Sequence, residues 1–183
     1  MGLGDVYKRQ RSRQLVISFV GDDRPGIVQT LSSIVNDHNG NWLESRMSRL
    51  AGKFAGVARI ELPAEQLELV KTRLAVVPDV SVLIEESHET SEDPTSLGYS
   101  LNIVGPDRTG ILQEVTADLS RQDINVVNME TRVGAAPMTG DLTFYAEANV
   151  TVPRSIDLGE LQQRLDVTAN ELGVDILMEA GDS

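Results

Sequence analysis

One short motif occurs twice in the chain, and this repetition constrains the fold more than any other feature. The first copy is Gly21-Asp22-Asp23-Arg24-Pro25-Gly26-Ile27, and the second, 84 positions later, is Gly105-Pro106-Asp107-Arg108-Thr109-Gly110-Ile111. The same interval separates Asn41 from Asn125. A duplication on this scale predicts two units of similar size, each with its elements in the same order.

Each copy of the motif follows a β-type run and precedes a helical pattern. The runs are residues 15–20 and 99–104, and the second alternates apolar and polar side chains. The apolar positions that follow recur at spacings of three and four residues, which places them on one helix face; they are Ile27, Leu31, Ile34 and Val35 in the first block and Ile111, Val115 and Leu119 in the second.

The rest of each block predicts a hairpin, a second helix and a last strand. The hairpin strands are 42–50 and 54–62, matched by 126–133 and 143–152, with a longer turn at 134–141 in the second block. The apolar positions of the second helices are Leu67, Val70 and Leu74, and Leu158, Leu161, Leu165 and Leu172; the last strands are 80–85 and 174–178. The order β-α-β-β-α-β predicts an α+β protein of two ferredoxin-like units, each a four-stranded antiparallel sheet with two helices on one face.

Two segments lie outside these patterns. Residues 1–13 are polar and unpatterned, and we expect a tail that is either disordered or an artefact of gene assembly. Residues 87–98 carry acidic and hydroxyl side chains with little apolar surface, so we expect a linker. The predicted units are therefore 14–86 and 99–180.

Composition narrows the function classes. Lys and Arg total 16 against 28 Asp and Glu, for a net charge of −12, which argues against direct binding to DNA or RNA. The chain has no Cys, so disulfides, thiolate nucleophiles and Cys-rich zinc sites are excluded. No apolar run approaches the roughly 20 residues that cross a bilayer. We therefore expect a cytoplasmic protein without membrane contact.

The repeated motif lies where a strand passes into a helix, which favours an anion site. Gly26 and Gly110 remove a Cβ beside the free N–H groups of the first helical turn, and Pro25 suits that turn. A phosphate loop would carry Lys and more Gly, and the nearby Asp would repel a polyanion. A free amino acid fits better, because its carboxylate binds the N–H groups while Asp23 and Asn41 receive its ammonium; we expect Asn41 beside the C-terminal end of the first strand.

Asp107 and Asn125 repeat this arrangement in the second block. Another interpretation remains open for the four polar side chains: Asp before a helix is commonly an N-cap, and Asn after one is commonly a turn or C-cap residue. Arg24 and Arg108 could hold a ligand, or they could be solvated or paired with the linker.

No catalytic constellation is recognisable. His38 and His88 lie far apart in the sequence with no Cys, and no nucleophile motif accompanies them. Glu44, Glu61 and Glu130 carry no metal-site signature. We therefore expect a protein that is not an enzyme, with no metal and no cofactor.

The motif and the element order resemble the ACT domain, a regulatory module that binds amino acids. Two such units in tandem are similar to the glycine cleavage system transcriptional repressor family, with Thr109 in the second motif where the first has Pro25. The resemblance implies effector binding at the two strand-to-helix loops with the two Asn residues facing them: Gly21, Asp22, Asp23, Arg24, Pro25, Gly26, Ile27 and Asn41, and Gly105, Asp107, Arg108, Thr109, Gly110, Ile111 and Asn125.

The resulting expectation is a non-catalytic regulator that binds a small amino acid of the glycine or serine class. It would modulate transcription or metabolism through a protein partner, such as a DNA-binding regulator. Two alternatives stay open: the orphaned regulatory half of an enzyme such as a formyltetrahydrofolate deformylase, and a dimerisation scaffold without a ligand. The first strand is apolar on both sides, so we also expect the sheet face without helices, or a sheet edge, to be covered by the other repeat or by another copy of the chain in a homo-oligomer.

Overall fold

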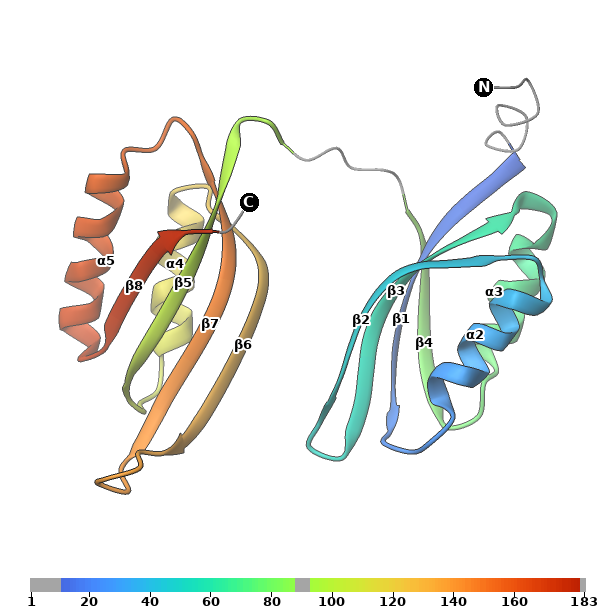
Figure 1. The fold of residues 1–183 in the computed structure, drawn as a ribbon, viewed down its shortest axis with the longest axis horizontal. Helices are drawn as coiled ribbons and strands as arrows, with labels where there is room; N and C mark the ends of the chain where they lie inside the picture. Colours follow the sequence, from blue (N-terminus) through green and yellow to red (C-terminus); the bar gives the residue numbers. More distant parts are fainter. Residues whose placement is uncertain (1–10, 88–92, 182–183) are drawn as a thin grey trace. The chain divides into compact units, whose positions relative to one another are not determined.

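The computed structural model describes residues 11–87 and 93–181, and the chain divides into two compact units between Thr90 and Ser91. Figure 1 shows one sheet and one pair of helices in each. The tail at residues 1–10 and His88 lie outside the described residues. Among the described helices, none is long and apolar enough to span a membrane.

The first unit is a four-stranded antiparallel sheet with its helices on one face. Its elements are β1 (Ser12–Asp22), α2 (Ile27–Asp37), β2 (Asn41–Leu50), β3 (Lys53–Pro63), a 3-10 turn (Ala64–Gln66), α3 (Leu67–Ala75) and β4 (Val80–Glu86). The strand order is β2-β3-β1-β4, with β1 paired to both β3 and β4. The predicted ferredoxin-like fold is confirmed.

The second unit repeats this architecture. Its elements are β5 (Ser96–Pro106), α4 (Ile111–Arg121), β6 (Asn125–Ala135), β7 (Leu142–Pro153), α5 (Leu158–Leu172) and β8 (Asp175–Ala180), with the strand order β6-β7-β5-β8. Both units break the register of the hairpin pair near the start of its first strand, at Trp42/Glu44 and at Val126/Asn128. The shared irregularity shows how closely the two copies follow one plan.

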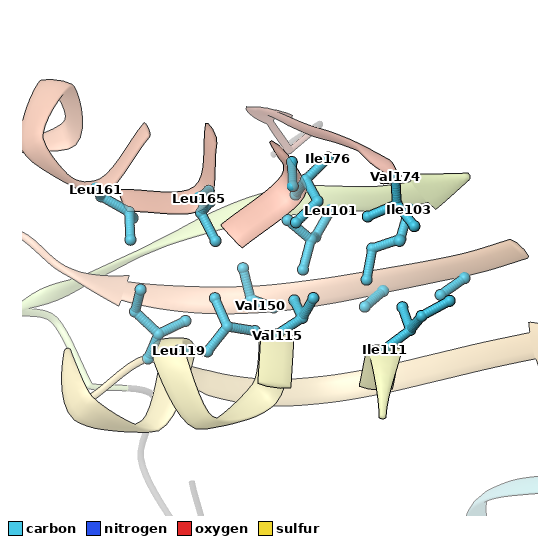
Figure 2. Close-up of a cluster of buried hydrophobic side chains, with 14 of the residues drawn as sticks. Leu101, Ile103, Ile111, Val115, Leu119, Val150, Leu161, Leu165, Val174 and Ile176 are labelled. Atoms are coloured by element: carbon cyan, nitrogen blue, oxygen red, sulfur yellow. The ribbon is translucent and has the colours of Figure 1, made fainter. Parts of the chain in front are cut away.

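Each unit has its own core between the sheet and the two helices. In the second unit, Leu101 and Ile103 of β5 meet Val115 and Leu119 of α4 and Leu165 of α5 (Figure 2). The corresponding core of the first unit contains Leu15, Ile17, Leu31, Ile60 and Leu74, each fully buried. These are the alternating strand positions and helix stripes that the sequence predicted. Leu158 is the exception: it is 41 % exposed because it is the first residue of α5.

Most strands differ from the predicted bounds by one or two residues, and the first strand of each unit starts three residues earlier than predicted. Strand β1 starts at Ser12 because its backbone pairs with the end of β3, so Ser12 and Arg13 belong to the sheet and not to a tail. Strand β5 starts at Ser96 because it pairs with Pro153 of β7, so residues 96–98 extend the sheet into the segment expected as a linker.

In the first unit, the sheet face opposite the helices is partly apolar. Val20, Val57 and Leu83 lie there, 45 %, 44 % and 62 % exposed. Arg59 crosses the same face, with its Nε 3.2 Å from a carboxylate oxygen of Glu44 and its Nη1 donating to Gln14 at 3.1 Å. The apolar residues on the second side of β1 therefore include an exposed side chain, Val20, on this face.

Candidate functional site at the strand-to-helix loops

Both motif copies place a glycine with a left-handed backbone immediately before a helix. Gly26 has φ 96° and precedes α2, and Gly110 has φ 89° and precedes α4. A Cβ disfavours this conformation, so the glycines set the angle at which each helix leaves its sheet. Pro25 lies one residue before the cap position, outside the first helical turn in which we expected it.

No side chain caps α2 or α4 in the described part of the chain. The first turn of each closes only through its backbone, with Thr30 donating to Gly26 at 2.9 Å and Glu114 donating to Gly110 at 3.0 Å. By contrast, Asp157 caps α5 by accepting from the amides of Gly159 and Glu160 at 2.8 and 3.1 Å. The capping interpretation of Asp23 and Asp107 is therefore wrong, because a left-handed glycine holds the cap position of each helix and no side chain accepts from its first amides.

The acidic side chains of the first loop instead meet the hairpin of β2 and β3. Asp22 contacts Lys53, and this hydrogen bond and charge hold the pKa of the Asp22 carboxyl below its usual range. Asp23 forms an ion pair with Arg49 at 3.4 Å, and its amide donates to the carbonyl of Gly52 at 2.9 Å. The loop is therefore held against the turn of the neighbouring hairpin.

The two arginines of the motif bind main-chain carbonyls. Arg24 donates to Pro78, at the turn before β4, at 3.0 Å, and Arg108 donates to Glu171, at the end of α5, at 3.4 Å. These contacts make both arginines part of the loop scaffold.

The second loop keeps its carboxylate unpaired. The amide of Asp107 donates to Leu142 at 2.9 Å, as Asp23 does to Gly52. Among the described residues, no ion pair or hydrogen bond involves the carboxylate of Asp107. The loops thus share a backbone shape but differ in the charge that they present.

The other motif residues serve packing. Ile27 and Ile111 are buried in the two cores. Gly21 and Gly105 allow close approach of the neighbouring chain: a Cβ on Gly21 would lie 2.9 Å from the carbonyl oxygen of Asp79, and one on Gly105 would lie 2.6 Å from Cγ1 of Val174. Thr109 is exposed in the position that Pro25 holds in the first loop.

Asn41 and Asn125 do not lie beside the loops of their own units. Asn41 is level with Glu61 and Gln14, at the start of β1, whereas the motif follows the end of β1. In the second unit, Asn125 is likewise level with Thr151 and Gly98, near the start of β5. The expected proximity is wrong because each helix runs back along the sheet and returns the chain to the end where the first strand began. Neither Asn is a helix cap.

Arg49 and Lys53 are the loop neighbours that the sequence reasoning missed. Asp22 is level with Lys53 in the β1–β3 register, and Leu50 is level with Lys53 in the hairpin. Pairing the hairpin residues outward from the predicted turn at 51–53, and aligning the hairpin with the end of β1, would have placed both basic side chains beside the motif. Within residues 11–87 and 93–181, no group of three or more His, Asp or Glu side chains could hold a metal.

Comparison with known proteins supports the fold and the repeat. The ACT domain model matches residues 13–79 and 100–179. The glycine cleavage system transcriptional repressor of Escherichia coli is 20 % identical over 161 residues, covering 86 % of this chain and 85 % of that protein.

Two solved structures cover nearly the whole chain. A protein of unknown function from Galdieria sulphuraria is 31 % identical with a TM-score of 0.83, over 93 % of this chain and 99 % of its own. A protein provisionally described as a glycine cleavage system transcriptional repressor has a TM-score of 0.71 at 18 % identity, over 94 % of this chain and 99 % of its own, and shows the same fold.

Proposed function

Because the chain belongs to the ACT domain family, we propose that it is a non-catalytic regulatory protein that binds a small amino acid of the glycine or serine class. In this proposal the occupied protein, a cytoplasmic homo-oligomer, modulates transcription or metabolism through a protein partner. The similarity to a repressor and the net charge of −12 support action through a partner that itself contacts DNA.

The uncapped helix starts carry this proposal. The N–H groups of the first turn and the helix dipole attract a carboxylate, and here no side chain of the described residues competes for them. A carboxylate beside each helix start, Asp23 or Asp107, is available for the ammonium of the same ligand. The binding groups are the loop residues 21–27 and 105–111, without Asn41 and Asn125 of the same unit, which lie at the far end of their sheets.

The loops differ in their readiness to bind. Asp23 is already paired with Arg49, so an ammonium must compete with a guanidinium. Asp107 has no such partner among the described residues. We therefore assign the tighter binding to the second loop.

A thermal-denaturation screen against the twenty amino acids tests the proposal. A ligand at about 100 times its Kd stabilises the native state by about 2.7 kcal/mol. In a chain of this size that raises the Tm by several degrees, at about 2–4 °C per kcal/mol. We expect a selective increase with glycine or serine that Asp107→Asn abolishes and Asp23→Asn reduces less, while the exposed Glu65→Gln serves as the matched control.

Other outcomes separate the remaining interpretations. No increase with any amino acid would contradict the sensor and favour a scaffold. An increase that survives both loop substitutions would contradict the assignment of the site. Affinity capture with and without the amino acid then tests whether partner binding depends on the ligand.

A further inference from the structure

The second unit carries a recess with charged side chains on the sheet face without helices, on the part of β5 that directly precedes the loop. It has a volume of about 160 Å³ and spans β5, β7 and β6. Two cross-strand rows form its walls: Asn102, Glu147 and Glu130 in one, and Val104, Tyr145 and Arg132 in the next. The intervening row, whose side chains alternate to the other face, supplies the floor with its backbone.

The first row brings two negative charges together. Glu130 and Glu147 are directly opposite each other on adjacent antiparallel strands, an arrangement in which like charges repel. Neither carboxylate has an ion pair or hydrogen bond with another described residue. The described residues offer no group of three or more potential metal ligands here, and two unpaired carboxylates can accept hydrogen bonds from an organic ammonium.

The second row supplies a positive charge at a defined place. The guanidinium of Arg132 lies over the ring of Tyr145, 3.8 Å from its centroid. This cation–π contact orients the guanidinium without using its hydrogen-bond donors on a carboxylate. Arg132 is two residues from Glu130 along β6, a separation of roughly 6.5 Å in a strand.

We propose that this recess, defined by Asn102, Glu130, Arg132, Tyr145 and Glu147, is a second binding site for the zwitterionic head of a small amino acid. The ammonium lies between the two glutamates, and the α-carboxylate accepts from Arg132. The separation of the charged rows matches a ligand whose two charges are a few bonds apart. The recess shares its ligand class with the proposed function, but its side chains lie on the sheet face without helices, whereas the loop site is formed at the start of α4.

The first unit provides an internal comparison. The row that corresponds to Asn102, Glu147 and Glu130 contains Ser18, Val57 and Arg46. An apolar side chain and a positive charge thus stand where the second unit has its carboxylates. The site belongs to the second unit alone, which gives the two repeats different tasks.

An NMR titration of the full-length ¹⁵N-labelled protein with glycine and with serine tests this site. We expect saturable shift changes at the amides of residues 102–104, 130–132 and 145–147 with at least one of the two. Glu130→Gln combined with Glu147→Gln weakens that binding about tenfold or more, as does Arg132→Gln. Arg46→Gln, at the matched row of the first unit, leaves it unchanged, and methylammonium or acetate alone binds more weakly than the zwitterion.

The same spectra separate this site from the loops. Shift changes at the recess that persist in Asp23→Asn and Asp107→Asn support the recess, whatever happens at Gly26 and Gly110. The proposal is overturned if neither amino acid shifts the recess amides in a saturable way, or if binding there survives the paired glutamate substitution. Because all three side chains are exposed or half-exposed, the variants retain the fold, and the dispersion of their own spectra verifies it.

Discussion

Two glycines on one strand show what the loss of a single Cβ contributes. A Cβ on Gly105 would lie 2.6–2.8 Å from atoms of Val174, whereas one on Gly98 would meet nothing within 4 Å. We expect Gly105→Ala to lower the stability of the second unit by about 1–3 kcal/mol through overpacking. Gly98→Ala should be neutral or stabilise by up to about 1 kcal/mol, since it restricts the unfolded chain.

Thermal denaturation of the two variants beside the parent protein makes this comparison. If Gly105→Ala and Gly98→Ala lowered the Tm equally, the close approach of β5 to Val174 would not be the reason that position 105 requires a glycine. The same reasoning explains why the motif repeats its first glycine: a Cβ on Gly21 would lie 2.9 Å from the carbonyl oxygen of Asp79.

Asp22 gives a second prediction at this scale. Its hydrogen bond to Lys53 and the charge of that residue, with a smaller contribution from Arg24, lower its pKa. Lys53→Gln should therefore raise the pKa of Asp22 toward the ordinary value, as measured by ¹³C NMR of the carboxyl carbon. A group with a lowered folded-state pKa stabilises the fold above its unfolded-state pKa, and this stabilisation disappears as the pH falls through the folded-state value.

The pH profile follows from that sign. In the parent protein, the contribution of Asp22 to stability is present at neutral pH and is lost only in acid. In Lys53→Gln most of this contribution should be lost, because only the smaller effect of Arg24 on the pKa of Asp22 remains. An unchanged carboxyl titration in the variant would show that Lys53 is not the cause.

At the scale of elements, an Asp that caps a helix, such as Asp157, can be distinguished from an Asp that lies before an uncapped helix, such as Asp23. Asp157→Ala removes the cap of α5 and should cost about 1 kcal/mol. Asp23→Ala removes only the ion pair with Arg49, in which the Asp23 side chain is 32 % exposed and the Arg49 side chain is 74 % exposed. This substitution should therefore lower the free energy of unfolding by less than about 1 kcal/mol.

Urea denaturation separates these effects. Trp42 is the only Trp in the chain, so its fluorescence follows the first unit, while circular dichroism follows both. A large loss from Asp23→Ala without ligand would indicate that this carboxylate is a structural element of the loop. A negligible loss from Asp157→Ala would contradict the capping geometry.

The elements themselves were predictable because their signals are local. Alternation along β5 and the apolar stripes of α2 and α4 depend only on neighbouring positions, and the core contains the residues that they named. The position of Asn41 was not predictable from these signals. It depends on the direction in which α2 returns the chain and on the register of β2 with β3, which no single segment encodes.

The candidate site was predictable only in part for the same reason. The glycine before each helix was readable from the motif, but the partners of Asp22 and Asp23 come from a hairpin about thirty residues away in sequence, Lys53 and Arg49. The recess of the second unit depends on three strands in register. Only the pairing of β6 with β7 reveals that Glu130 and Glu147 are opposite each other.

At the scale of the whole molecule, the repeats have kept a backbone plan and changed its surface. On the sheet faces without helices, the Arg59–Glu44 ion pair of the first unit is matched by an amide pair in the second, where Asn149 donates to Asn128 at 2.8 Å. Since the cores and the backbone shape of the loops are shared, the functional difference between the units is to be sought on these faces and in the charges that the loops present.

The charge of the whole chain leads to the last prediction, that the protein alone does not bind duplex DNA. With 28 acidic against 16 basic side chains, the long-range field repels phosphates. Several basic side chains that a DNA backbone could attract are already paired, Arg49 with Asp23, Lys53 with Asp22 and Arg59 with Glu44. Fluorescence anisotropy of a labelled duplex at about 0.1 M salt, where the Debye length is about 10 Å, should remain unchanged with and without glycine or serine. Binding that weakens steeply with added salt would contradict this prediction, since it would reveal phosphate contacts, and it would remove the need for a DNA-binding partner from the proposed function.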